Sequence, residues 1–89
     1  MTTWTLVVAA SARRVIDRLP EKVAVAVIDF MLGPLCENPA RVGKALRGDL
    51  EGLHSARVGA YRIVYAIDAA STTVQVVHID HRADVYRPR

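Results

Sequence analysis

The chain has 89 residues, of which 52% are hydrophobic, and this predicts one domain spanning residues 1–89 around one core. A lone cysteine, Cys36, excludes an internal disulfide framework; with no signal peptide or membrane span evident, we expect a cytoplasmic protein. The formal net charge is +3, and all of the excess positive charge lies in residues 41–89, which contain eight basic and five acidic residues.

The N-terminal part of the sequence predicts one strand followed by two helices. Residues 4–8 are rich in β-branched and aromatic residues, which is typical of a strand. Apolar residues recur at helical spacing over residues 12–19, with Ser11 as the expected N-cap. A longer helix is predicted over residues 21–37. The apolar stripe of that helix consists of Ala24, Val27, Ile28, Met31 and Leu35.

The second half predicts a loop and three strands. Residues 40–52 contain three glycines and no clean period, so we expect a basic loop there. Residues 53–58, 61–67 and 72–80 are predicted strands, and short turns join them into an antiparallel meander. The two helices are the available cover for the apolar face of these strands. We therefore predict an α+β fold with both helices on one face of the sheet, which leaves Arg62 on the other face.

Four residues in the second half of the chain are candidates for catalysis. The family resemblance described below implies cleavage of RNA, which needs a group that takes the 2′-proton, a group that protonates the leaving 5′-oxygen, and positive charge at phosphorus. Arg62 and Arg82 are candidates for the charge, His81 for base or acid, and Tyr86 for stacking or proton orientation. Structural alternatives are a cross-strand ion pair for Arg62, a strand-ending hydrogen bond for His81 and simple packing for Tyr86.

Other charged and titratable side chains are weaker candidates. Residues expected to position phosphates on RNA are Lys44, Arg47, Arg57 and Arg87, although ordinary surface charge explains any one of them equally well. His54 is a weak candidate, and His78 lies among apolar strand residues, which favours a structural role. Asp80 and Asp84 are expected to pair with arginines. No metal-ligand spacing or nucleotide-binding loop occurs, so we expect no metal and no cofactor.

Three motifs resemble the RelE-like toxins of bacterial type II toxin–antitoxin pairs. They are Arg-x-Gly-x-Tyr-Arg at residues 57–62, His-Arg-x-x-Val-Tyr-Arg at residues 81–87, and the stretch at residues 43–53 that begins Gly-Lys-Ala-Leu-Arg. The predicted order of strand, two helices and three strands matches that family as well. The resemblance therefore covers nearly the whole chain.

The resemblance implies a metal-independent endoribonuclease that cleaves messenger RNA, usually on the ribosome, and so inhibits translation. The implied chemistry is attack of a 2′-hydroxyl on the adjacent phosphate. A cognate RelB-like antitoxin is the implied partner, and the pair commonly represses its own promoter DNA. The family's pair of lysines is absent, because Leu53 and Ser55 occupy those positions. Either His81 supplies the base, or cleavage is weak, or the target differs.

Two other functions are compatible with the sequence. A ParE-like toxin shares the fold but binds DNA gyrase instead of cutting RNA, and it would not need His81 or Tyr86. A non-enzymatic RNA- or DNA-binding module would bind in a strongly salt-dependent manner without cleavage. The second alternative leaves the cluster of Arg, His and Tyr without an explanation.

Overall fold

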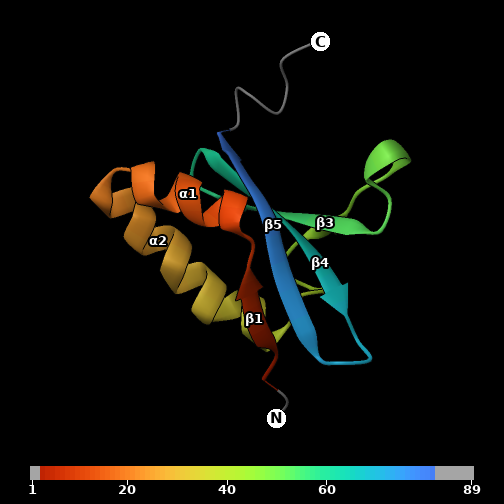
Figure 1. Cartoon of the computed structure of the whole chain (residues 1–89). Helices are drawn as coiled ribbons and strands as arrows, with labels where there is room; N and C mark the ends of the chain where they lie inside the picture. The colour runs from red at the N-terminus through yellow and green to blue at the C-terminus, as the bar shows by residue number, and fades with distance from the viewer. Residues whose placement is uncertain (1–2, 82–89) are drawn as a thin grey trace.

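The computed structural model describes residues 3–81, which form a five-stranded sheet with helices on one face (Figure 1). In chain order the elements are β1 (Thr5–Val8), α1 (Ala10–Arg18), α2 (Glu21–Leu32), α3 (Pro34–Glu37), β2 (Lys44–Ala45), a 3₁₀ turn η1 (Gly48–Leu50), β3 (Leu53–Val58), β4 (Tyr61–Asp68) and β5 (Thr73–His81). The predicted α+β class is confirmed, as is the antiparallel meander of β3, β4 and β5.

The sheet has the strand order β1-β5-β4-β3-β2, so it is wider than the meander alone. β1 pairs with β5 in parallel, although all three helices and the other three strands lie between these two strands in the chain (Figure 1). At the other edge, β2 pairs antiparallel with β3. The prediction of a loop over residues 40–52 therefore missed a short strand and the turn η1.

The helices differ from the prediction at their ends. Ser11 is not an N-cap: it lies inside α1, and its hydroxyl donates a hydrogen bond of 3.2 Å to the carbonyl oxygen of Val77 on β5. The predicted helix over residues 21–37 is two helices, because the backbone turns at Gly33 and α3 starts at Pro34, which has no N–H to donate. None of the helices within residues 3–81 is long and apolar enough to cross a membrane.

The core lies between the helices and one face of the sheet. Its buried members are Ala12, Val27, Met31, Leu35, Cys36, Ala56, Ile63, Tyr65, Val74, Val76 and Ile79. Cys36 is a packing residue: its thiol is buried and donates to the carbonyl oxygen of Met31 at 3.1 Å, and burial raises the pKa of that thiol.

One member of the predicted apolar stripe of α2 faces outward. Ile28 is 38% exposed, and Val25 and Leu32 are exposed as well, at 52% and 64%. The spacing of these three residues places them along one side of the helix. We call Val25, Ile28 and Leu32 the outer stripe of α2.

Candidate functional site

The face of the sheet that points away from the helices carries polar side chains in two cross-strand rows. In the first row Arg57 lies opposite Arg62, and Arg62 lies opposite Asp80. The second row consists of Lys44, Ser55, Val64 and His78. Directly opposed residues share a face, and alternation places these two rows on the side opposite the core residues Ile63 and Tyr65.

A basic hollow of about 450 Å³ opens over β3 and the segment that leads into β2. We use this name for the space lined by Arg41, Val42, Gly43, Lys44, Ser55, Ala56, Arg57 and Arg62. Four of these residues carry positive charge, and among residues 3–81 no carboxylate belongs to the lining. Such a concave cluster attracts anions, and guanidinium groups can hold a phosphate through two parallel hydrogen bonds. The hollow is therefore suited to a phosphodiester backbone.

Tyr65 holds the segment that carries Arg41 and Lys44 in place. The ring of Tyr65 is fully buried, and its hydroxyl donates a hydrogen bond of 2.6 Å to the carbonyl oxygen of Pro39. Gly43 lies directly against the same hydroxyl and against the carbonyl oxygen of Ser55, with no room for a side chain. The positions of the two cations thus depend on a buried aromatic residue of β4.

The buried phenol predicts a loss of stability at alkaline pH. Burial raises the pKa of Tyr65 to about 12, whereas an unfolded tyrosine titrates near 10. The contribution of Tyr65 to stability is therefore complete below about pH 10 and falls by up to about 1.4 kcal/mol per pH unit up to about pH 12. Urea unfolding between pH 8 and pH 11 should show this loss in the wild type and a smaller one in Tyr65→Phe. Equal alkaline slopes for the two proteins would contradict the prediction.

His54 supports this arrangement rather than lining the hollow. Its ring stacks on Tyr65 with centroids 5.6 Å apart and an interplanar angle of 22°. Its Nδ1 is buried and has no hydrogen-bond partner. Its side chain lies on the face of β3 that carries the core residue Ala56. His54 was a weak candidate from the sequence.

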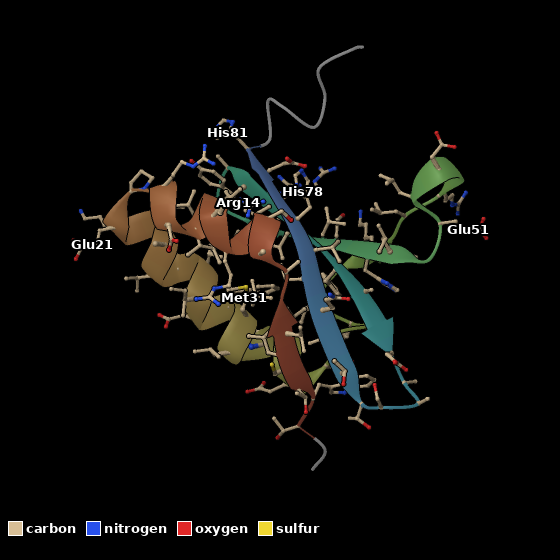
Figure 2. The ribbon with its side chains drawn as sticks, in the orientation of Figure 1. Arg14, Glu21, Met31, Glu51, His78 and His81 are labelled. Atoms are coloured by element: carbon tan, nitrogen blue, oxygen red, sulfur yellow. The ribbon has the colours of Figure 1, made fainter. Side chains whose placement is uncertain are left out.

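His81 lies at the end of β5 (Figure 2) and contacts Tyr61 edge to face, with ring centroids 5.0 Å apart. Because Tyr61 and His81 are opposed in the register, they share a face of the sheet, whereas Arg62 and Asp80 share the other. The structure therefore does not bring His81 into the basic hollow with Arg62. His81 instead lines a second hollow of about 360 Å³. That second hollow is bounded by Val15, Arg18 and Leu19 of α1, Tyr61 of β4, and residues 78–81 of β5.

The other predicted site residues lie in the basic hollow, outside its lining, or outside the described part of the chain. Lys44, Arg57 and Arg62 meet in the basic hollow, whereas Arg47 is exposed just before η1 and does not belong to its lining. The predicted site residues outside the described part of the chain are Arg82, Asp84, Tyr86 and Arg87. Within residues 3–81, no group of three or more His, Cys, Asp or Glu side chains is placed to hold a metal ion.

Sequence reasoning did not single out Arg41, and it favoured a structural role for His78. Arg41 lies in a segment without periodicity, and only the fold brings it to β3. Simple alternation with Val74 and Val76 would bury His78, but the register shifts by one residue between His78 and Val76. This β-bulge turns His78 to the open face, where its side chain is 52% exposed and pairs with Asp80. The predicted arginine neighbour of Asp80 is present as well, because Arg62 lies directly opposite it in the β4–β5 register.

Comparisons with known proteins identify the family. A model of the family described as ParE toxin of type II toxin–antitoxin system, parDE, matches residues 4–86. Toxin RelE of Mycobacterium tuberculosis is 54% identical over 84 residues, covering 94% of this chain and 87% of the relative. Toxin RelG of the same organism is 46% identical over 84 residues, with coverage of 94% and 97%.

A solved structure agrees with these relatives. A chain in the crystal structure of the toxin–antitoxin complex RelBE2 from Mycobacterium tuberculosis matches with 45% identity and a TM-score of 0.88. The match covers 94% of the present chain and 97% of that one. The resemblance seen in the sequence motifs is thus confirmed over nearly the same residues. The chain belongs to the RelE/ParE family of toxins from type II toxin–antitoxin systems.

Proposed function

We propose that the chain is an endoribonuclease that cleaves messenger RNA on the ribosome and is neutralised by a RelB-type antitoxin. The observation that supports this function is the basic hollow on the open face of the sheet, whose lining within residues 3–81 has four cations and no carboxylate. A scissile phosphate bound there meets preorganised positive charge where negative charge grows during 2′-oxygen attack. The chemistry uses groups of the chain and needs no metal.

The cations of the hollow have different roles in this proposal. Arg62 stabilises the phosphorane-like charge, because it projects from a central strand and is partly buried. Arg41, Lys44 and Arg57 hold the neighbouring phosphates. The sequence adds further proposed roles. His81, Arg82 and Tyr86 are proposed for catalysis, and Arg47 and Arg87 for positioning phosphates. Arg47 and His81 lie outside the lining of the hollow, and the other three lie outside residues 3–81.

The experiment combines purified toxin with translating ribosomes and maps the new RNA ends by primer extension or sequencing. We expect cuts within the translated message that leave a cyclic phosphate and a 5′-hydroxyl. Intact messages at toxin concentrations that stop growth in cells would contradict the proposal.

The main alternative is a toxin that binds DNA gyrase. The description of the matching family as a ParE toxin favours this alternative. Gyrase supercoiling and cleavage assays with the same protein distinguish the two functions. Linearised plasmid that depends on gyrase, without new RNA ends in the ribosome assay, would select the alternative.

The antitoxin is proposed to cover the outer stripe of α2. The RelBE2 structure is described as a toxin–antitoxin complex, and the stripe of Val25, Ile28 and Leu32 is apolar surface that a partner can bury. Leu32 is the most exposed of the three, so its replacement should leave the fold intact.

Replacing Leu32 with Asp is expected to weaken antitoxin binding by about 10-fold or more, because a carboxylate would be buried without a partner in the complex. Isothermal titration calorimetry with the cognate antitoxin measures this change. Glu21→Gln, at the exposed first residue of the same helix, serves as the control and should bind like the wild type. Unchanged affinity of Leu32→Asp would place the antitoxin elsewhere.

A further inference from the structure

A histidine and an aspartate form a close pair on the open face of β5. His78 and Asp80 are alternate residues of that strand, so both side chains project from the same side of it. The Nε2 atom of His78 and the Oδ1 atom of Asp80 are 2.6 Å apart, with 52% and 27% of the two side chains exposed. We call these two residues the β5 pair. The separation is that of a short, charge-assisted hydrogen bond.

The β5 pair lies next to Arg62, the residue that is proposed to stabilise the negative charge on the phosphate. Arg62 is directly opposed to Asp80 in the β4–β5 register, which brings their Cα atoms within about 4.5–5.5 Å of each other. His78 is opposed to Val64, two residues further along β4 on the same face as Arg62. A phosphate held by Arg62 is therefore a diagonal cross-strand neighbour of the His78 ring, a distance that long side chains and a bound nucleotide can bridge.

The two hollows divide this group of residues between them. Arg62 forms part of the lining of the basic hollow, whereas His78 and Asp80 line the second hollow together with Tyr61 and Arg18. Because Arg62 and Asp80 are directly opposed, the linings of the two hollows adjoin at this point of the sheet. The second hollow offers an aromatic ring and a guanidinium plane, the two side-chain types that stack with unpaired bases.

We propose that His78 is the catalytic base of the RNA cleavage and that Asp80 is its positioning residue. This inference rests on the proposed function of the basic hollow. The Asp80 carboxylate accepts a hydrogen bond from Nε2–H, which fixes the ring tautomer and leaves the lone pair of Nδ1 to accept a proton.

The proposed step conserves atoms and charge. Nδ1 of His78 takes the proton of the 2′-hydroxyl, and the 2′-oxygen forms a bond to phosphorus. The bond between phosphorus and the 5′-oxygen breaks, and the 5′-oxygen keeps the electron pair and takes a proton from water. The products are a 2′,3′-cyclic phosphate and a 5′-hydroxyl, and the imidazolium returns its proton to solvent. The step needs no oxidant, reductant or cofactor.

The assignment gives the β5 pair a pH signature. Charged or titratable groups around the imidazole are Asp80 on its own strand, Arg62 on β4, and Arg18 and His81 in the second hollow. A base must be neutral to accept the proton, so the cleavage rate should fall on the acidic side of the profile as the imidazole protonates. Replacing His78 should remove that acidic limb.

The test measures single-turnover cleavage of messages on programmed ribosomes with saturating toxin, between pH 5 and pH 8.5. Wild type, His78→Ala, His78→Gln and Asp80→Asn are compared, with Gln75→Ala as an exposed control on the same strand. Affinity is measured separately on a message with a 2′-deoxynucleotide at the cleavage position. Thermal unfolding verifies that each variant is folded.

We expect both His78 variants to cleave about 10²–10⁴-fold more slowly, with affinity for the deoxy message within about twofold of the wild type. Added imidazole should restore part of the rate of His78→Ala, which a purely structural histidine would not permit. Asp80→Asn should lower the rate without changing affinity, and Gln75→Ala should match the wild type.

The outcomes separate this inference from the function on which it rests. Wild-type cleavage together with undiminished rates in the His78 variants overturns the assignment of the base and leaves the endoribonuclease intact. A folded His78→Ala that is slow but not restored by imidazole, with weakened affinity, also overturns it. A wild type that cuts no message overturns both proposals.

Discussion

Arg62→Ala is expected to lower the rate of RNA cleavage by about 10²–10³-fold. The guanidinium belongs to the basic hollow and lies on β4, a strand with a hydrogen-bonded neighbour on both sides. Its removal leaves the growing charge on the phosphate without its central partner, while Arg41, Lys44 and Arg57 still bind the backbone. The loss should therefore appear in the single-turnover rate more than in affinity. Quantified RNA ends from programmed ribosomes provide the measurement.

Two further variants make this prediction specific. Arg62→Lys keeps one positive charge but loses the planar fork, so its rate should lie between those of the wild type and Arg62→Ala. Arg13→Ala removes an exposed guanidinium from α1, outside the basic hollow, and should cleave like the wild type. If Arg13→Ala slowed cleavage as much as Arg62→Ala, total charge rather than the hollow would govern the reaction.

Gly43→Ala is expected to destabilise the fold by about 1–3 kcal/mol and to disturb the hollow at the same time. A Cβ at this position would overlap the hydroxyl of Tyr65 and lie 2.5 Å from the carbonyl oxygen of Ser55. The chain can relieve that overlap only by moving the segment that carries Arg41 and Lys44. Chemical denaturation measures the stability, and RNA affinity reports the displaced cations.

A double-mutant cycle identifies the atom that is responsible. Tyr65→Phe deletes the hydroxyl, which removes one of the two overlaps and also the hydrogen bond to Pro39. Gly43→Ala should therefore cost less free energy of unfolding in the Tyr65→Phe background than in the wild type. Identical costs in both backgrounds would show that the contact with Ser55 alone sets the limit.

The regular parts of the fold could be predicted from local pattern. Alternation along residues 61–67 placed Ile63 and Tyr65 inside and Arg62 outside, as observed, because side chains in a strand alternate between faces. The Gly-Pro pair at residues 33–34 is a local signal for the break before α3, although one helix was predicted over residues 21–37. These features depend on neighbours in the sequence, so the sequence alone was sufficient.

The parts that failed depend on contacts between distant residues. No local signal indicates that β1 pairs with β5, or that Lys44 lies opposite Ser55. The bulge in β5 turns His78 to the outer face, and a bulge leaves no periodic trace in a strand this short. Of the residues in the basic hollow, the sequence singled out Lys44, Arg57 and Arg62, whereas the place of Arg41 there and the outward position of His78 depend on the assembled sheet.

The parallel pairing of β1 with β5 has a consequence for synthesis of the chain. Residues 5–8 emerge first, but their partners at residues 73–76 are among the last of the described strands to be made. At about 5–20 residues per second, the first strand stays unpaired for roughly 3–14 s while the ribosome completes the chain. Pairs this distant in sequence also form slowly, because a large loop must close before any contact is gained. A nascent toxin therefore completes its sheet late in translation, and the apolar side chains of α1 and α2 remain accessible to chaperones until then.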